Sequence, residues 1–320
     1  MENTPVEIKT DENHLVSVAM ATYNGERYLK EQLDSIYAQT YKNIEVIVTD
    51  DCSSDKTVKI LEQYAESHGL RYSVNETNLG FVKNFERAIS LCKGAYIALA
   101  DQDDVWEREK IEVLVREIGS DLLIHSDCSI IDGKSAVTAP YWKRERGFNI
   151  KVENLLRANV VTGCTVLFKR ELLKSALPFP EGIAYHDWWL ALCAANLNKI
   201  VYIPSCLTRY RQHTGQNTGS DIKNPFKTFF INLYKRRNKL DFDRMIGIRK
   251  QRQNLLAIRE GNIAVSIEKD YLEDLIAYFD DYLNHALHIN SFVIGLRYHK
   301  QFYPRNNYLF LKNILYDIVG

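Results

Sequence analysis

The sequence has no excess of charge of either sign and no long apolar run. Lys and Arg residues number 41 and Asp and Glu residues also number 41, so the formal net charge is +0 at pH 7. Without an overall positive field, we expect no nucleic-acid partner. No stretch approaches the ~18 to 20 uninterrupted apolar residues of a membrane-spanning helix. The polar opening of residues 1–14 also lacks the apolar centre of a signal peptide, so we expect a cytoplasmic location.

Paired cysteines and a glycine-rich nucleotide loop are also absent. The 6 cysteines are far apart and form no C-x-x-C pair, so we expect reduced thiols that pack as small apolar side chains rather than a zinc or redox site. The first expected strand is not followed by the G-x-G-x-x-G turn that lets a backbone approach a dinucleotide. This absence disfavours a nicotinamide-dependent enzyme.

The sequence does contain an alternation of short β-branched runs with longer segments of helical period. Strands are expected at residues 15–21, 44–49, 71–74, 95–100, 122–126, 164–168 and 199–203, and helices at residues 26–39, 55–67, 81–92, 106–118 and 187–195. This order predicts an α/β fold, a Rossmann-like and mostly parallel sheet flanked by helices. From residue 219 the pattern is helical only. We therefore expect a polar leader (1–14), an α/β domain (15–218) and an all-helical C-terminal region (219–320).

Polar residues follow the expected strands at the end where ligands bind in open α/β sheets. The strand at 95–100 is followed by Asp101, Asp103 and Asp104. These carboxylates repel one another, and a divalent cation such as Mg²⁺ or Mn²⁺ would offset that repulsion with oxygen ligands. The alternative is a solvated acidic turn in which Asp103 or Asp104 caps the following helix.

Short motifs along the chain together resemble one family. They are V-S-V-A-M-A-T-Y-N at 16–24, T-D-D-C-S-S-D at 49–55, A-D-Q-D-D-V-W at 100–106, G-C-T at 163–165, H-D-W-W at 186–189 and Y-R-Q-H at 210–213. In this order they resemble the nucleotide-diphosphosugar glycosyltransferases of family two, which have the GT-A fold, over residues 15–218. The D-Q-D-D-V-W and H-D-W-W pair is most similar to bacterial members that transfer rhamnose onto surface polysaccharides.

The resemblance implies a nucleotide-sugar site and a metal site. The Tyr23 ring would lie against the base, and Asp51 would accept a hydrogen bond from the base imide. Asp101 and Asp103 match the ends of the family's D-x-D motif and would hold Mn²⁺ or Mg²⁺ on the diphosphate, with His213 completing the metal shell. The residues expected to bind the nucleotide sugar are Thr22, Tyr23, Asn24, Asp51, Lys83, Asn84, Asp101, Gln102 and Asp103.

The resemblance also implies a catalytic residue and an acceptor site. Asp187 would be the general base that takes a proton from the attacking sugar hydroxyl. Trp188 and Trp189 would wall the acceptor site, and Gly163 would let the backbone approach a substrate. The alternative is that Asp187 caps the helix at 187–195 while the tryptophans pack in the core.

The resulting hypothesis is a metal-dependent inverting glycosyltransferase. It would move a sugar, L-rhamnose being the first candidate, from a dTDP- or UDP-linked donor to a hydroxyl of a glycan or lipid-linked glycan of the cell surface. The alternatives are a catalytically silent nucleotide- or carbohydrate-binding protein of the same fold and a sugar nucleotidyltransferase. The basic, aromatic segment from Phe226 to Lys239 is expected to lie on the cytoplasmic membrane face, or to pack on the α/β domain or a second subunit.

Overall fold

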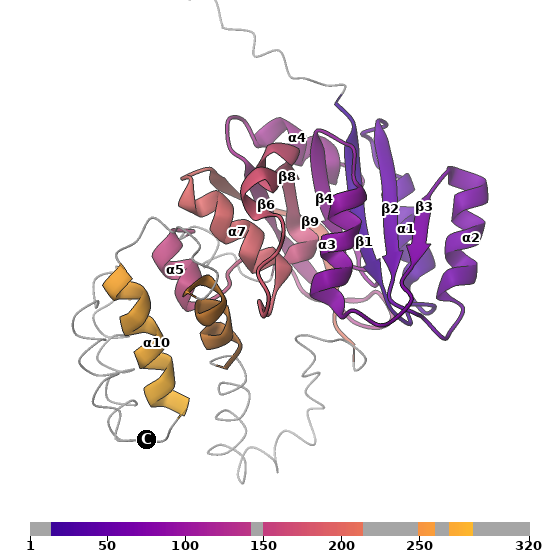
Figure 1. Cartoon of the computed structure of the whole chain (residues 1–320). Helices are drawn as coiled ribbons and strands as arrows, with labels where there is room; N and C mark the ends of the chain where they lie inside the picture. The colour runs from indigo at the N-terminus through magenta and orange to yellow at the C-terminus, as the bar shows by residue number, and fades with distance from the viewer. Residues whose placement is uncertain (1–13, 142–149, 214–248, 260–268, 284–320) are drawn as a thin grey trace, which may run out of the picture.

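The computed structural model describes residues 14–141, 150–213, 249–259 and 269–283, in which a curled central sheet is covered by helices (Figure 1). Its strands follow the order β3-β2-β1-β4-β8-β6-β9-β5, with β7 paired to β6. They are β1 (Val16–Thr22), β2 (Ile44–Asp50), β3 (Arg71–Val74), β4 (Tyr96–Ala100), β5 (Val105–Trp106), β6 (Leu123–Ile131), β7 (Val137–Ala139), β8 (Val166–Lys169) and β9 (Ile200–Arg211). The expected α/β class is confirmed.

The sheet is parallel in one half and mixed in the other. β1 pairs in parallel with β2 and β4, and β2 pairs in parallel with β3. β8 then runs antiparallel to both β4 and β6, while β6 and β9 are parallel. Strand direction leaves no trace in the hydrophobic pattern of a fully buried run such as β8, so the sequence did not reveal this reversal.

Helices form two layers, one on each face of the sheet. One apolar cluster joins α3, α5 and α7 to the sheet, and the other joins α1, α2 and α4 to the opposite face. The helices are α1 (Leu29–Tyr37), α2 (Thr57–His68), α3 (Phe81–Leu91), α4 (Lys110–Glu117), α5 (Val152–Arg157), α6 (Leu173–Ala176), α7 (His186–Asn196), residues 249–259 and α10 (Lys269–Leu283). Because β1 and β4 are covered on both sides, their sequences are mostly apolar, and the polar residues Ser17 and Thr22 of β1 are themselves buried.

The segment after the acidic loop differs from the expectation. The helix expected at 106–118 begins at Lys110, and Val105–Trp106 forms β5, which pairs with Arg209 and Thr208 of β9. A two-residue strand is too short to show a period of two, so its apolar residues looked like the start of the helix. The expectation that Asp103 or Asp104 caps that helix is therefore wrong.

The strands after residue 120 also differ from the expectation. β6 and β9 extend well beyond 122–126 and 199–203, and they stay paired through register shifts around Asp127. Cys164 lies in a 3₁₀ turn (Gly163–Thr165) before β8. Helices α5 and α6 and strand β7 were not expected from the sequence, because each is too short to display a clear period.

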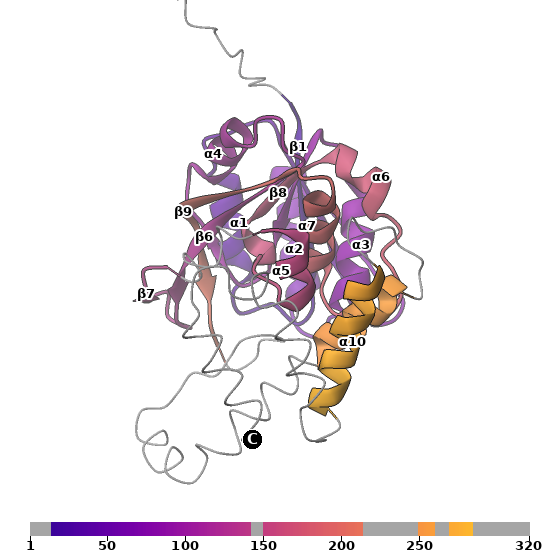
Figure 2. The ribbon, with the colours of Figure 1, turned by 90° about the vertical axis from the view of Figure 1, so that its left-hand side faces the viewer.

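The described C-terminal helices pack on the α/β core. Residues 249–259 and α10 lie side by side next to α5 in two perpendicular views (Figures 1 and 2). Their apolar side chains belong to the same core cluster as α3 and α7. The Asn254 Oδ1 accepts the Ala184 main-chain N–H at 2.7 Å, and Gln251 Nε2 donates to the carbonyls of Leu155 and Leu156. The helix at 249–259 thus fastens the chain just before α7.

Three further expectations can be compared with the structure. All 6 cysteines are free thiols, as expected. Among the described helices, none combines the length and apolar character that crossing a bilayer requires. The segment from Phe226 to Lys239 lies outside the described residues.

Shared packing predicts that α10 stabilises the entire chain. Replacing the fully buried Leu275 by Ala should lower the free energy of unfolding by about 2–5 kcal/mol, because it leaves a cavity in the common core. Denaturant unfolding monitored by circular dichroism measures this change. The matched control, Glu273→Ala on the exposed face of the same helix, should change it by less than about 0.5 kcal/mol. An equally small effect of Leu275→Ala would mean that α10 contributes nothing to the core.

Candidate functional site

Buried polar contacts tie the carboxyl ends of β1 and β2 together. The Thr22 hydroxyl donates to Asp50 Oδ1 at 2.8 Å, and the Asp50 carboxylate also accepts the Ser53 main-chain N–H and hydroxyl at 2.8 and 2.6 Å. The Thr22 carbonyl accepts the Asp51 N–H at 2.8 Å. The polar groups of Thr22 and Asp50 are thus engaged in the framework below the site.

The Asp51 carboxylate organises the loop that leads into α3. Its Oδ1 accepts hydrogen bonds from Asn75 Nδ2 and the Leu79 N–H, each at 2.8 Å, and its Oδ2 accepts the Gly80 N–H at 2.9 Å. The buried Asn84 amide donates to the carbonyls of Thr22 and Thr49 at 3.3 and 2.9 Å. Asn84 is therefore a framework residue, whereas Asp51 keeps acceptor capacity on Oδ2.

A side-chain clamp joins the loop after β1 to the acidic loop. Gln102 Oε1 accepts the Tyr23 N–H at 2.9 Å, and Gln102 Nε2 donates to the Tyr23 carbonyl at 3.0 Å. A Cβ on Gly25 would lie 2.3 Å from Gln102 Oε1, so this approach requires glycine. With its backbone held in this way, Tyr23 leaves its side chain 46% exposed at the edge of the sheet.

Two other residues expected at the nucleotide are engaged elsewhere. Asn24 has a left-handed φ of 47°, and its Oδ1 accepts the Ser54 N–H at 2.9 Å. Lys83 pairs with Glu86 at 2.8 Å on the surface of α3. Asn24 therefore shapes a turn, and the Lys83 ammonium is directed along its own helix.

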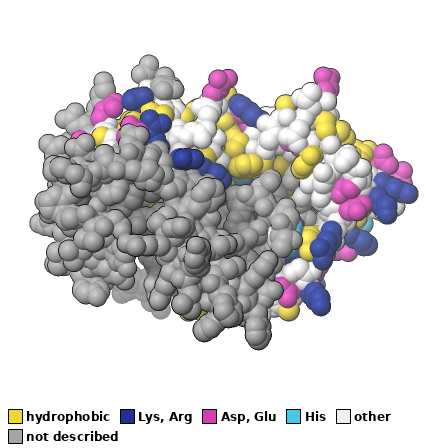
Figure 3. Space-filling view, turned by 90° about the horizontal axis from the view of Figure 1, so that it is seen from below, with side chains coloured by type: hydrophobic (Ala, Val, Ile, Leu, Met, Phe, Trp, Pro, Cys, Tyr) yellow, Lys and Arg dark blue, Asp and Glu magenta, His cyan; other side chains and the backbone are white. Residues whose placement is uncertain are grey.

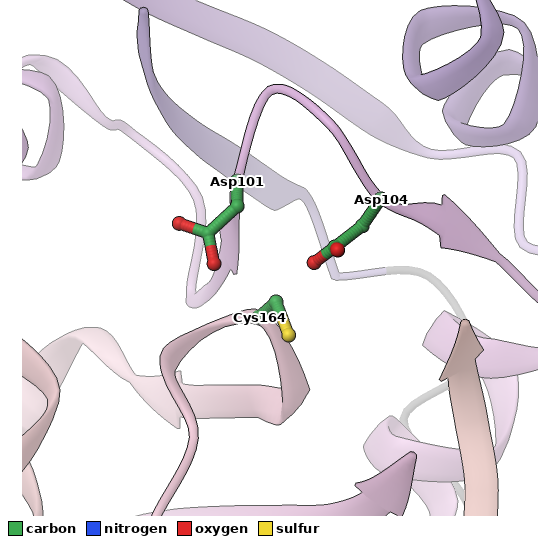
Figure 4. Close-up of side chains that lie close together, drawn as sticks. All are labelled: Asp101, Asp104 and Cys164. Carbon is green, nitrogen blue, oxygen red and sulfur yellow. The ribbon is translucent and has the colours of Figure 1, made fainter. Parts of the chain in front are cut away.

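The acidic loop divides its carboxylates between two groups of partners. Asp103 Oδ2 lies 2.8 Å from His213 Nε2, so residues far apart in the sequence meet at one point. Asp101 and Asp104 lie instead close to the Cys164 thiol, and one ligand atom from each of these three lies within 4.8 Å of the others (Figure 4). The structure thus brings Asp103 and His213 together, and it places Asp101 in a second cluster with Asp104 and Cys164, called here the deeper cluster.

A buried lysine lies under this deeper cluster. Lys110 Nζ donates to the Cys164 carbonyl at 2.5 Å and to Thr208 Oγ1 at 2.9 Å, and it lies 3.6 Å from the centre of the Trp106 ring. Burial lowers the pKa of Lys110 to about 7, while the neighbouring carboxylates act to raise it. When charged, the ammonium partly balances Asp101 and Asp104.

The electrostatics of the loop fit a divalent cation. Burial, Asp103 and Asp187 raise the pKa of Asp101 to about 7, and burial with the two other loop aspartates raises the pKa of Asp104 well above its usual range. Among the described residues, Asp104 Oδ2 has no hydrogen-bond partner. Two carboxylates and an imidazole suit Mg²⁺ or Mn²⁺. Of the expected ligands Asp101, Asp103 and His213, the structure brings Asp103 and His213 together, whereas a ligand atom of Asp101 lies near those of Asp104 and Cys164. A cation at the acidic loop would relieve the repulsion among its carboxylates.

Asp187 lies in the first turn of α7, close enough to the acidic loop for its charge to raise the pKa of Asp101. Its Oδ1 accepts Asn159 Nδ2 at 3.0 Å and the Trp188 N–H at 2.7 Å. A Cβ on Gly163 would lie 3.5 Å from Asp187 Oδ2, so the glycine leaves space next to that oxygen. The N-cap of α7 is Tyr185, and the alternative in which Asp187 is that cap is therefore wrong.

The two tryptophans after Asp187 belong to the core. Trp188 and Trp189 are 0% and 3% exposed. The indole N–H of Trp188 donates to the Leu155 carbonyl at 2.6 Å, and that of Trp189 donates to the Ala176 carbonyl at 2.8 Å. Neither ring presents a face to an acceptor, which corrects the expectation that they wall the acceptor site. An indole whose N–H reaches a backbone carbonyl packs in a core without an unpaired donor.

The sequence did not identify three residues that support the site. Asn159 orients Asp187, Lys110 lies beneath the acidic cluster, and Arg211 contacts the main chain of Asp103 at 2.6 Å through Nε. Arg211 lies within the Y-R-Q-H motif, which was the available signal. A lone lysine next to the apolar face of α4 carries no signal, because such residues are usually solvated.

No single sign of charge dominates the outer surface seen from below the molecule. Lys and Arg side chains alternate with Asp and Glu side chains over the described part of that face (Figure 3). The described surface therefore agrees with the balanced composition of the whole chain.

Comparisons with known proteins agree on one family. The model of glycosyl transferase family 2 matches residues 17–177. A dTDP-rhamnosyl transferase of Shigella flexneri is 32% identical over 242 residues, which cover 69% of this chain and 80% of that protein. A protein of Haemophilus influenzae, named an uncharacterized glycosyltransferase, is 27% identical over 338 residues and 99% of both chains.

A solved structure shares the fold. A mannosyltransferase of Pyrobaculum calidifontis, in complex with GDP-Man and Mn²⁺, superposes with a TM-score of 0.55 at 18% identity, over 99% of this chain and 89% of that one. At this identity the likeness concerns the fold alone.

The residue before Asp187 is a buried histidine. The His186 ring stacks on Phe85 with centroids 3.9 Å apart and planes at 18°. Neither ring nitrogen has a hydrogen-bond partner among the described residues. Burial lowers the pKa of His186 to about 4, so the imidazole is neutral at physiological pH.

His186 should make stability depend on pH in a defined window. Its pKa is about 4 in the folded chain and about 6.5 in an unfolded one. The unfolded state thus binds more protons between these values, and His186 should contribute a loss of about 3 kcal/mol in stability as the pH drops from 7 to 4. The raised pKa of Asp101 acts in the opposite direction over the same range, so the quantity to measure is a difference: acidification from pH 7 to 4 should destabilise the parent by about 3 kcal/mol more than it destabilises His186→Leu. The exposed His68→Gln should respond to pH as the parent does, and an equal response of His186→Leu and the parent would contradict the assignment.

Proposed function

The chain belongs to glycosyl transferase family 2, and from this premise we propose that it uses Asp187 as general base in an inverting, cation-dependent sugar transfer. The observation that carries the proposal is the nearness of Asp187 to the acidic loop: Asp187 lies beside Gly163, the neighbour of Cys164, and its charge raises the pKa of Asp101. An in-line displacement needs a base on the acceptor side and positive charge on the leaving-group side. One pocket holds candidates for both.

The acceptor side is built from α7 and the 3₁₀ turn. Asn159 and the Trp188 N–H hold Asp187 Oδ1, which leaves Oδ2, beside Gly163, to take the proton of an attacking hydroxyl. The displaced nucleoside diphosphate leaves on the opposite side, toward the acidic loop.

The leaving-group side is built from the acidic loop and the end of β9. Asp101, Asp103 and His213 would hold Mn²⁺ or Mg²⁺, and the solved mannosyltransferase with GDP-Man and Mn²⁺ supports this choice of cation. A divalent cation there would stabilise the negative charge that develops on the leaving diphosphate. Gln102 keeps the acidic loop aligned with Tyr23, whose exposed ring suits a nucleotide base.

We propose dTDP-L-rhamnose as the donor and a hydroxyl of a cell-surface glycan or lipid-linked glycan as the acceptor. The similarity to the dTDP-rhamnosyl transferase of Shigella flexneri supports the donor. Asp51 keeps an acceptor position on Oδ2, which suits the imide N–H shared by thymine and uracil.

The experiment that tests this function supplies the purified chain with Mn²⁺ and a panel of dTDP-, UDP- and GDP-linked sugars. We expect release of nucleoside diphosphate to be greatest with dTDP-L-rhamnose and a glycan acceptor, and to stop in chelator. Greatest turnover with another donor would overturn the rhamnose assignment, and full turnover in chelator would overturn the cation requirement.

Asp187→Asn should lower the transfer rate by roughly 10²-fold or more, because an amide cannot take a proton. The amide oxygen still accepts the contacts from Asn159 and Trp188, so donor affinity and melting temperature should remain near those of the parent. Steady-state kinetics and nucleotide-sugar titration measure both. The control Asp34→Asn, on the exposed face of α1, should keep the parent rate. Near-normal transfer by Asp187→Asn would exclude it as the base.

A further inference from the structure

The last residue of β9 makes more polar contacts with the acidic loop than its place in the sequence suggests. Arg211 is 0% exposed. Its main-chain N–H donates to Asp104 Oδ1 at 2.9 Å, and its Nε donates to the Asp103 carbonyl at 2.6 Å. One residue thus fixes both the backbone of Asp103 and the side chain next to it.

The far end of the guanidinium is anchored in two other segments. Nη1 donates to the Asp132 carbonyl at 3.1 Å and to Ser135 Oγ at 3.0 Å, in the turn between β6 and β7. Nη2 donates to Glu31 Oε2 of α1 at 2.7 Å. The planar fork therefore connects the acidic loop to a helix and a hairpin, which a lysine ammonium cannot do with the same geometry.

A tyrosine ring extends this arrangement to the histidine. The Arg211 guanidinium carbon lies 4.5 Å from the centre of the Tyr28 ring, and the His213 ring lies 4.9 Å from the same ring. Arg211 and His213 thus pack on one aromatic side chain of the segment before α1. His213 Nε2 and Asp103 Oδ2 are 2.8 Å apart. Arg211 holds Asp103 through the Asp103 carbonyl, and it positions His213 through the adjoining backbone and through the Tyr28 ring that both residues contact.

We propose that Arg211 is a positioning residue that sets Asp103 and His213 at the spacing needed to share one divalent cation. The inference rests on the cation site of the proposed function. It concerns how this chain builds that site, since Arg211 reaches Asp103 through the main-chain carbonyl while Asp103 Oδ2 lies 2.8 Å from His213 Nε2. Burying the guanidinium costs desolvation energy, which its four side-chain hydrogen bonds, one of them to the Glu31 carboxylate, offset.

The test compares Arg211→Lys with Arg209→Lys. Arg209 lies on the same strand, and its exposed guanidinium pairs with Glu107 at 2.7 Å. Mn²⁺ affinity without donor is measured from the electron paramagnetic resonance signal of free Mn²⁺, and melting temperature and steady-state kinetics are measured in parallel. We expect Arg211→Lys to bind Mn²⁺ at least 10-fold more weakly and to raise KM for the donor more than it lowers kcat. Arg209→Lys should match the parent in all three.

A milder variant keeps the test decisive if Arg211→Lys does not fold. Glu31→Gln removes one charge at the outer end of the fork and should weaken Mn²⁺ binding 2- to 5-fold with little change in melting temperature. If Arg211→Lys folds and binds Mn²⁺ as tightly as the parent, the inference is overturned. If Arg211→Lys does not fold, the same result for Glu31→Gln would overturn it. So would a parent that binds no Mn²⁺ yet still transfers sugar. A parent that binds Mn²⁺ and transfers no sugar would contradict the proposed function and leave the positioning role standing.

Discussion

Mutual repulsion among buried carboxylates is the constraint around which this molecule is organised. The loop from Asp101 to Asp104 holds three acidic side chains close together, and Asp103 raises the pKa of both Asp101 and Asp104. The fold supplies part of the compensation from below through Lys110 and part from the side through the Arg211 N–H. The remaining negative charge is what the proposed cation would offset, and it results from the way the surrounding strands bring the three carboxylates together.

Many polar groups around the proposed site form hydrogen bonds to neighbouring parts of the chain. Asp51 holds the turn at Leu79 and Gly80, and Gln102 holds both main-chain groups of Tyr23. These contacts fix the backbone and leave only a few groups pointing outward, such as the Tyr23 ring. A site arranged in this way loses little conformational freedom when a ligand binds, which favours affinity and correct alignment.

The sequence predicted elements of the fold correctly where an apolar run ends in polar residues, because this pattern marks the end of a strand. It did not predict the roles of side chains whose partners are far away in the sequence. The strands from Val16 to Ala100 and the place of the acidic loop follow from apolar runs that end in polar residues. The roles of Trp188 and Arg211 depend instead on which carbonyls lie near an indole or a guanidinium after folding. No local pattern encodes such partners. The pairing of β5 with β9 is of the same kind, because two residues cannot display a period.

The contact between Asn254 and the segment before α7 has a consequence for the order in which the molecule is completed. The Ala184 N–H donates its hydrogen bond to the side chain of Asn254, which lies 70 residues later in the chain. Chains emerge from the ribosome amino end first, and early segments begin to fold before late ones exist. The acidic loop and its strands are therefore synthesised well before the support behind Asp187. During synthesis, the residues of the acidic loop therefore exist before Asn254, which anchors the segment ahead of α7. The acidic loop and the fully anchored α7 that carries Asp187 are completed one after the other.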